Sequence, residues 1–136
     1  MKKLFQTKLN NTSIDLSLLL LRLATGVFML THGFPKLQRL LAGEMQFGDP
    51  IGLGPEVSLV LAVFAEVVCS ILIVLGLGTR LAAIPLIVTM AVAAFIAHGA
   101  DPFGRKELAL LYLVGYVVLL LSGSGKISVD RIISRK

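Results

Sequence analysis

The sequence predicts an all-α integral membrane protein, a single antiparallel four-helix bundle with both termini on the inner side of the membrane. The first observation is composition: 56% of the 136 residues are hydrophobic, and the mean hydropathy of +0.89 exceeds that of ordinary soluble domains. The second is pattern, because the apolar residues form four stretches separated by charged or Gly- and Pro-rich connections. Since each span takes about 20 residues, we expect residues 1–136 to form one domain.

The first two helices flank the longest connection in the chain. The first helix is expected over residues 14–34, because Thr12, Ser13 and Asp15 can cap its start and Pro35 should end it there or shortly beyond. A segment rich in Gly and Pro follows as far as residue 56, and its length suits a lid or a partner surface. The second helix is expected over residues 57–77.

The last two helices are joined to their neighbours by short connections. A tight turn at residues 78–80 makes the second and third helices antiparallel neighbours, with the third expected over residues 81–98. The fourth helix is expected over residues 107–121, where a Ser-Gly-Ser-Gly-Lys sequence ends it. Residues 127–136 alternate apolar and charged side chains, so this tail should lie along the membrane surface.

The distribution of Lys and Arg predicts the orientation. With the N-terminus inside, the inner side holds eight such residues: Lys2, Lys3, Lys8, Arg80, Lys126, Arg131, Arg135 and Lys136. The outer side holds four: Lys36, Arg39, Arg105 and Lys106. This excess places both termini in the cytoplasm. The net charge of +5 therefore reflects topology and contact with lipid headgroups, and nucleic acid is not an expected partner.

Two ionisable residues, Arg22 and Glu66, fall inside the apolar stretches. An ionised side chain at mid-bilayer costs about 2.5–3.5 kcal/mol on insertion scales, so both should face protein. Counting about 1.5 Å per residue from the expected helix ends places Arg22 roughly 12 Å and Glu66 roughly 16 Å above the inner membrane edge. We therefore expect an intramembrane ion pair between them. It is either a structural link between two helices or part of a proton or substrate site at Glu66.

The helical phase of the first stretch supports an inward-facing stripe. At 100° per residue, the residues that share a face with Arg22 are Thr25, Gly26, Met29, Gly33 and Lys36. Small residues on such a stripe allow close helix packing in membranes. The single cysteine, Cys69, lies on the corresponding face of the second helix, and one cysteine excludes a dithiol relay within this chain.

A second polar group is predicted at the outer ends of the helices. The same count of about 1.5 Å per residue places His32 about 27 Å and His98 about 26 Å above the inner membrane edge. Lys36, Asp101 and Glu107 belong to the same layer. Such a group can relay protons, bind a quinone headgroup, or serve only interfacial hydrogen bonding and capping. Two histidines without a motif do not indicate a haem or a metal site, and none is expected. Tyr112 and Tyr116 are either inward-facing hydroxyls or lipid-facing aromatics, and we favour the second interpretation.

The ordered motifs resemble the DoxX family of small bacterial membrane proteins over nearly the whole chain. The matching positions are Arg22, His32-Gly33-x-x-Lys36, Glu66, the turn at Gly76 and Gly78-Thr79-Arg80, His98, and Gly-x-x-Ser-x-Asp at Gly125, Ser128 and Asp130. The resemblance implies a four-helix inner-membrane protein, with relatives described as oxidoreductases or accessory membrane subunits. DoxD relatives belong to a thiosulfate:quinone oxidoreductase, and others are linked to membrane assemblies that resist redox stress.

The leading interpretation is a redox-associated or quinone-interacting accessory subunit of a membrane oxidoreductase system. Without a cysteine pair or a flavin-binding motif, the chain would need an external electron carrier. Its expected partners are membrane lipids, a membrane or periplasmic redox protein, and a second copy of itself. Two alternatives stay open: a small oligomeric transporter or channel that uses Glu66, and a non-catalytic assembly or scaffold protein.

Overall fold

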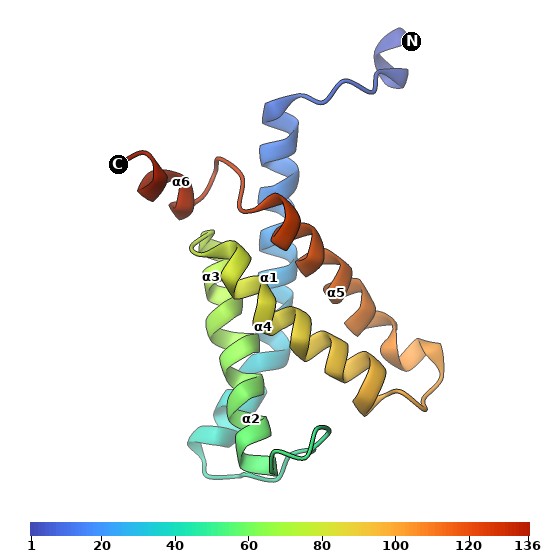
Figure 1. The fold of residues 1–136 in the computed structure, drawn as a ribbon, viewed down its shortest axis with the longest axis vertical. Coiled ribbons are helices and arrows are strands. Elements are labelled where there is room, and N and C mark those ends of the chain that lie inside the picture. Colours follow the sequence, from blue (N-terminus) through green and yellow to red (C-terminus); the bar gives the residue numbers. More distant parts are fainter.

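The computed structural model describes all residues 1–136 and consists of helices without any strand (Figure 1). The elements in chain order are η1 (Lys2–Phe5), α1 (Asn11–Leu41), α2 (Pro55–Val63), η2 (Phe64–Cys69), α3 (Ser70–Leu75), α4 (Thr79–Val92), η3 (Ala93–Ala97), α5 (Phe103–Ser122) and α6 (Val129–Ser134). Both η2 and η3 are π-helical stretches that continue the α-helices beside them. The prediction of an all-helical chain is therefore confirmed.

Three helical segments are long and apolar enough to cross a membrane: residues 11–41, 55–75 and 79–97. The fourth long helix, α5, has 20 residues and begins with charged side chains at Arg105, Lys106 and Glu107. Their apolar outer surfaces, exposed in the isolated chain, are what a multi-pass membrane protein presents to lipid. The chain is therefore an all-helical, multi-pass membrane protein.

Helix α1 continues for nearly two turns beyond its predicted end and passes through Pro35. The reason is tertiary packing of its last turns. Leu37 and Leu40 pack with α2 side chains in a cluster centred on Leu59 and Val63. Pro35 itself is exposed, so its ring meets no packed neighbour and removes only one backbone donor. Burial of the leucines outweighs that loss.

Helix α1 lies along the continuous segment α2–η2–α3, and α4 packs against α5 (Figure 1). The buried residues of α1 are Arg22, Thr25, Gly26, Met29 and Gly33, so the predicted inward stripe is confirmed. Gly26 is required there, because a Cβ on it would come within 2.5 Å of a Val74 methyl group. Small residues thus allow α1 and α3 to pack closely.

Both chain termini lie at the same end of the molecule as the turn between α3 and α4, and we call this the terminal end (Figure 1). The opposite end, which holds residues 42–54 and 98–102, is called the loop end. At the terminal end, Asp130 accepts hydrogen bonds from the amides of Gly78 (2.7 Å) and Thr79 (3.2 Å), and its own amide donates to the Gly76 carbonyl (2.9 Å). The segment after α5 therefore folds back over the α3–α4 turn.

Arg22 joins this segment to α3. Its guanidinium donates to the Ile73 and Val74 carbonyls of α3 at 3.0 and 2.9 Å. It also donates to the Ser124 and Ile127 carbonyls, at 3.0 and 2.6 Å, in the segment after α5. The side chain is only 1% exposed, and the carbonyls at the C-terminal end of a helix carry partial negative charge. The buried cation is thus compensated by backbone dipoles.

Candidate functional site

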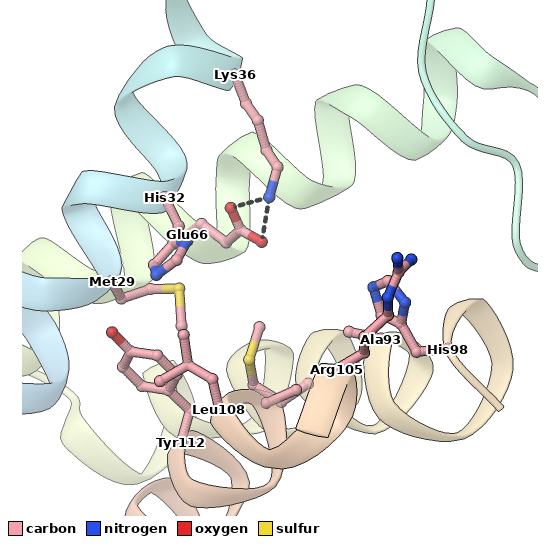
Figure 2. Close-up of a pocket in the computed structure, with 11 residues that line it drawn as sticks. Met29, His32, Lys36, Glu66, Ala93, His98, Arg105, Leu108 and Tyr112 are labelled. Carbon is pink, nitrogen blue, oxygen red and sulfur yellow. Dashed lines mark hydrogen bonds and ion pairs between the residues drawn. The ribbon is translucent and has the colours of Figure 1, made fainter. Parts of the chain in front are cut away.

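A cavity of about 230 Å³ lies toward the loop end (Figure 2). It is lined from four directions by α1, η2, the α4–η3 helix and α5. The lining residues are Met29, His32, Lys36, Glu66, Met90, Ala93, His98, Arg105, Leu108, Ala109 and Tyr112. Four of the residues predicted as site residues, His32, Lys36, Glu66 and His98, are thus brought together around one space.

Glu66 and Lys36 form an ion pair at the edge of this cavity. The Lys36 ammonium group lies 2.7 and 2.5 Å from the two Glu66 carboxylate oxygens. The Glu66 side chain is 4% exposed and the Lys36 side chain 26% exposed, so the pair sits where charge interactions are stronger than in water. Figure 2 shows the Lys36 chain reaching down from α1 to the carboxylate.

The predicted ion pair between Arg22 and Glu66 is wrong. The prediction depends on the first helix beginning at the membrane edge near residue 14, whereas α1 begins at Asn11 and extends beyond the α3–α4 turn (Figure 1). Arg22 therefore lies level with Ile73, whose carbonyl it contacts. The α1 residue level with Glu66 is Gly33, and Lys36, three residues further along, becomes the partner of the carboxylate.

The two π-helical stretches both border the cavity. Glu66 belongs to η2, while η3 contributes Ala93 and leads directly into His98. A π-helical turn holds one more residue than an α-helical turn and is frequent at functional sites. Here the wider turns occur at the two places where the cavity meets an acid and an imidazole.

His98 forms a hydrogen bond with Asp101. Its Nδ1 lies 2.7 Å from an Asp101 carboxylate oxygen. This hydrogen bond lowers the pKa of Asp101, and the nearby charges of Arg105 and Lys106 lower it further. Because Nδ1 is occupied by the carboxylate, Nε2 is the nitrogen that His98 has free for a ligand in the cavity.

His32 faces an aromatic pair on α5. The ring of Tyr112 lies edge-on to the His32 ring, with centroids 5.9 Å apart, and stacks on Tyr116 at 6.0 Å. Tyr116 is fully buried and its hydroxyl donates to the Thr25 carbonyl at 3.2 Å. The interpretation of both tyrosines as lipid-facing is therefore wrong. Their phase, opposite to the charged Glu107, was the signal in the sequence that they face inward.

Two charged residues near the start of α5, Glu107 and Arg105, lie differently from their predicted positions. Glu107 is exposed and does not line the cavity, so it does not join the predicted outer layer. Arg105, predicted only as one of the basic residues on the outer side, does line it. The reason is that α5 begins at Phe103, four residues before the predicted start, and so brings Arg105 onto the inward face with Leu108 and Tyr112. Their spacing of three and seven residues is typical of one helix face.

Two remaining candidates lie away from the cavity. Arg80 is exposed at the terminal end, and its guanidinium donates to the Leu121 carbonyl at 3.4 Å. Cys69 is buried among core side chains at 2% exposure. No group of three or more His, Cys, Asp or Glu side chains is placed to hold a metal ion. The predicted site residues that the structure brings together thus lie at the loop-end cavity.

The chain is similar to several known proteins over most of its length. A protein of Bacillus subtilis (strain 168) named "Putative oxidoreductase CatD" is 32% identical over 121 residues, which cover 88% of this chain and 89% of that protein. An uncharacterized protein of Haemophilus influenzae is 35% identical over 121 residues, covering 81% of this chain and 85% of that protein. The uncharacterized membrane protein Rv3486 of Mycobacterium tuberculosis is 29% identical over 145 residues, covering 88% and 83%.

No solved structure matches the chain. The family model described as DoxX matches residues 17–99, which include Arg22, the Lys36–Glu66 pair and His98. Together with the relatives above, this match establishes that the chain belongs to the DoxX family.

Proposed function

We propose that this DoxX-family protein is an accessory subunit of a membrane oxidoreductase system and binds a quinone headgroup in the loop-end cavity. The observation that carries the proposal is the Lys36–Glu66 ion pair, which borders a cavity also lined by two histidines and a tyrosine. The name of the Bacillus subtilis relative, which refers to oxidoreductase activity, supports a redox setting.

The lining residues suit both forms of a quinone. The carbonyl oxygens of the oxidised ring accept hydrogen bonds, which Lys36 and Arg105 can donate. The hydroxyl groups of the quinol donate hydrogen bonds, which the Glu66 carboxylate can accept. Reduction of a quinone to a quinol takes two electrons and two protons. The chain holds a single cysteine, so we assign the supply of electrons to a partner protein.

The proposed arrangement in the membrane is a four-helix antiparallel bundle with α5 as the fourth span. The excess of Lys and Arg at the terminal end supports a cytoplasmic location for both termini. The cavity then opens toward the outer face of the bacterial inner membrane, where a membrane or periplasmic redox partner, or a second copy of this chain, has access to residues 42–54.

Quinone titration of the purified protein in lipid nanodiscs tests this proposal. Ubiquinone and menaquinone analogues should bind saturably to the wild type. Glu66→Gln should weaken binding of the reduced, quinol forms about ten-fold, because it removes the charged acceptor of a quinol hydroxyl hydrogen bond. Glu107→Gln is the matched control, since that acid is exposed and outside the cavity, and its affinity should equal that of the wild type. Absence of saturable binding to the wild type would reject the proposal.

A transporter that uses Glu66 as a proton or ion site is the second candidate. The observation in its favour is that this buried carboxylate borders hollows on two sides, as a site in a conduction path would. Proton or substrate flux into liposomes that vanishes in Glu66→Gln, without quinone binding, would favour the transporter. Absence of both binding and flux would favour a non-catalytic assembly role.

A further inference from the structure

A second hollow, of about 360 Å³, adjoins the cavity on the side of α2 and α4. Four residues border both spaces: Lys36, Glu66, Ala93 and His98. The two hollows therefore adjoin at the ion pair.

The lining of the two hollows differs in chemistry. Apart from the shared residues, the first is lined by His32, Arg105 and Tyr112 together with four apolar side chains, Met29, Met90, Leu108 and Ala109. The second is lined mostly by hydrocarbon groups: Phe47, Pro50, Ile51, Leu61, Ala62, Val88, Val92 and Ala97. A hydrocarbon lining favours apolar groups over water. One end of a ligand should therefore be polar and the other apolar.

The second hollow opens toward the lipid-facing surface between α2 and α4. Leu61 of α2 and Val88 of α4 line it and are 47% and 55% exposed in the isolated chain. Both belong to segments that are apolar enough to cross a membrane. A chain that leaves the hollow between these residues would pass into the acyl region of the bilayer.

The loop end supplies a defined wall for this hollow. Asp49 accepts hydrogen bonds from the Gly54 amide (3.1 Å) and the Ser58 hydroxyl (3.3 Å), which tie residues 49–54 to the start of α2. Phe47 packs on the α2 cluster, and its ring centroid lies 6.0 Å from the Lys36 ammonium group. In Figure 1 this part of the chain folds back beside α2, below the end of the α4–η3 helix.

We infer that the second hollow holds the hydrocarbon tail of the ligand, so that the substrate is a lipid-borne, tailed quinone that enters from the bilayer between α2 and α4. This inference rests on the proposed function for its headgroup. It excludes water-soluble, tailless quinones as the ligands for which the site is built, because they would leave the apolar hollow unfilled.

The test compares two probes with one headgroup, a tailless benzoquinone and the same ring with a decyl tail, on the full chain in nanodiscs. Val92→Phe adds volume to the second hollow only, since Val92 lines that hollow and not the first. It should weaken the decyl form about ten-fold by steric exclusion and leave the tailless form unchanged. Ala97→Phe is a second filling variant, at an exposed position that tolerates volume. The matched control is Val118→Phe on the exposed face of α5.

The outcomes separate the two proposals. The tail site would be overturned if the two probes bound the wild type with equal affinity and neither filling variant changed either affinity. This result is expected if bilayer lipid fills the hollow. The headgroup proposal would still stand. Failure of both probes to bind the wild type would reject the proposed function and the tail site with it. A decyl probe carrying a photoreactive diazirine should label residues 88–97 in the wild type. Labelling spread over the exposed face of α5 instead would also overturn the inference.

Discussion

Gly33 lies directly against the backbone of Glu66, so closely that a Cβ on residue 33 would come within 2.8 Å of the Glu66 carbonyl oxygen. This contact sets the register between α1 and η2, and it places Lys36, less than one turn further along α1, over the Glu66 carboxylate. The ion pair at the candidate site thus depends on residue 33 being a glycine, which has no Cβ.

Gly33→Ala should destabilise the protein by about 1–3 kcal/mol, because the added methyl group must push α1 away from η2. The apparent melting temperature in detergent measures this loss. Gly104→Ala is the matched control: it is a helical glycine whose added Cβ would meet nothing within 4 Å, and it should be neutral or slightly stabilising. A Gly33→Ala protein as stable as the wild type would contradict the close contact.

Lys36→Met should destabilise the protein more than loss of an exposed lysine, because it leaves the Glu66 carboxylate buried without a partner. Breaking a fully buried pair costs roughly 3–5 kcal/mol, and the partial exposure of Lys36 reduces that figure. The double variant Lys36→Met/Glu66→Leu should recover part of the loss, since no unpaired charge remains. Lys8→Met, at an exposed position, is the control. Additive effects of the two substitutions would contradict the pairing.

Arg22→Met should loosen the segment after α5, because that segment's Ser124 and Ile127 carbonyls lose their donor. Each hydrogen bond to a charged group contributes about 1.5–3 kcal/mol. Trypsin should therefore cleave after Lys126 and Arg131 faster in the variant than in the wild type, as mass spectrometry of the fragments would show. Arg80→Met removes an exposed arginine with one long hydrogen bond and should leave the cleavage rate unchanged. Equal cleavage rates in Arg22→Met and Arg80→Met would contradict the prediction that Arg22 holds the segment after α5 in place.

The pairing of Asp101 with His98 predicts a pH dependence of stability. Since the folded-state pKa of Asp101 is lowered by its bond to His98, its contribution is present above the unfolded pKa, about 3.9. That contribution is lost as the pH falls through the folded pKa. Wild type should therefore be more stable than Asp101→Asn at neutral pH, and the difference should vanish in acid. Melting curves between neutral pH and pH about 3 measure it. Glu107→Gln should show no such convergence, and a pH-independent difference for Asp101→Asn would contradict the prediction.

The sequence by itself determined the all-helical architecture, the four apolar stretches and the inward stripe of α1, because hydropathy and helical phase depend only on the order of residues. The family resemblance also followed from motifs in the chain. His32, Lys36 and His98 were grouped correctly because all three lie toward the loop-end halves of their helices, where the cavity is.

Only the tertiary structure decided the partners of the charged side chains. Partner choice depends on how far one helix slides along another, and this offset is set by contacts such as Gly33 against Glu66 and Gly26 against Val74. Periodicity carries no information on that offset, so Arg22 was assigned to Glu66 although it binds backbone carbonyls at the terminal end. Packing likewise decided the passage of α1 through Pro35 and the inward position of Tyr116, because both depend on what the neighbouring helices bury.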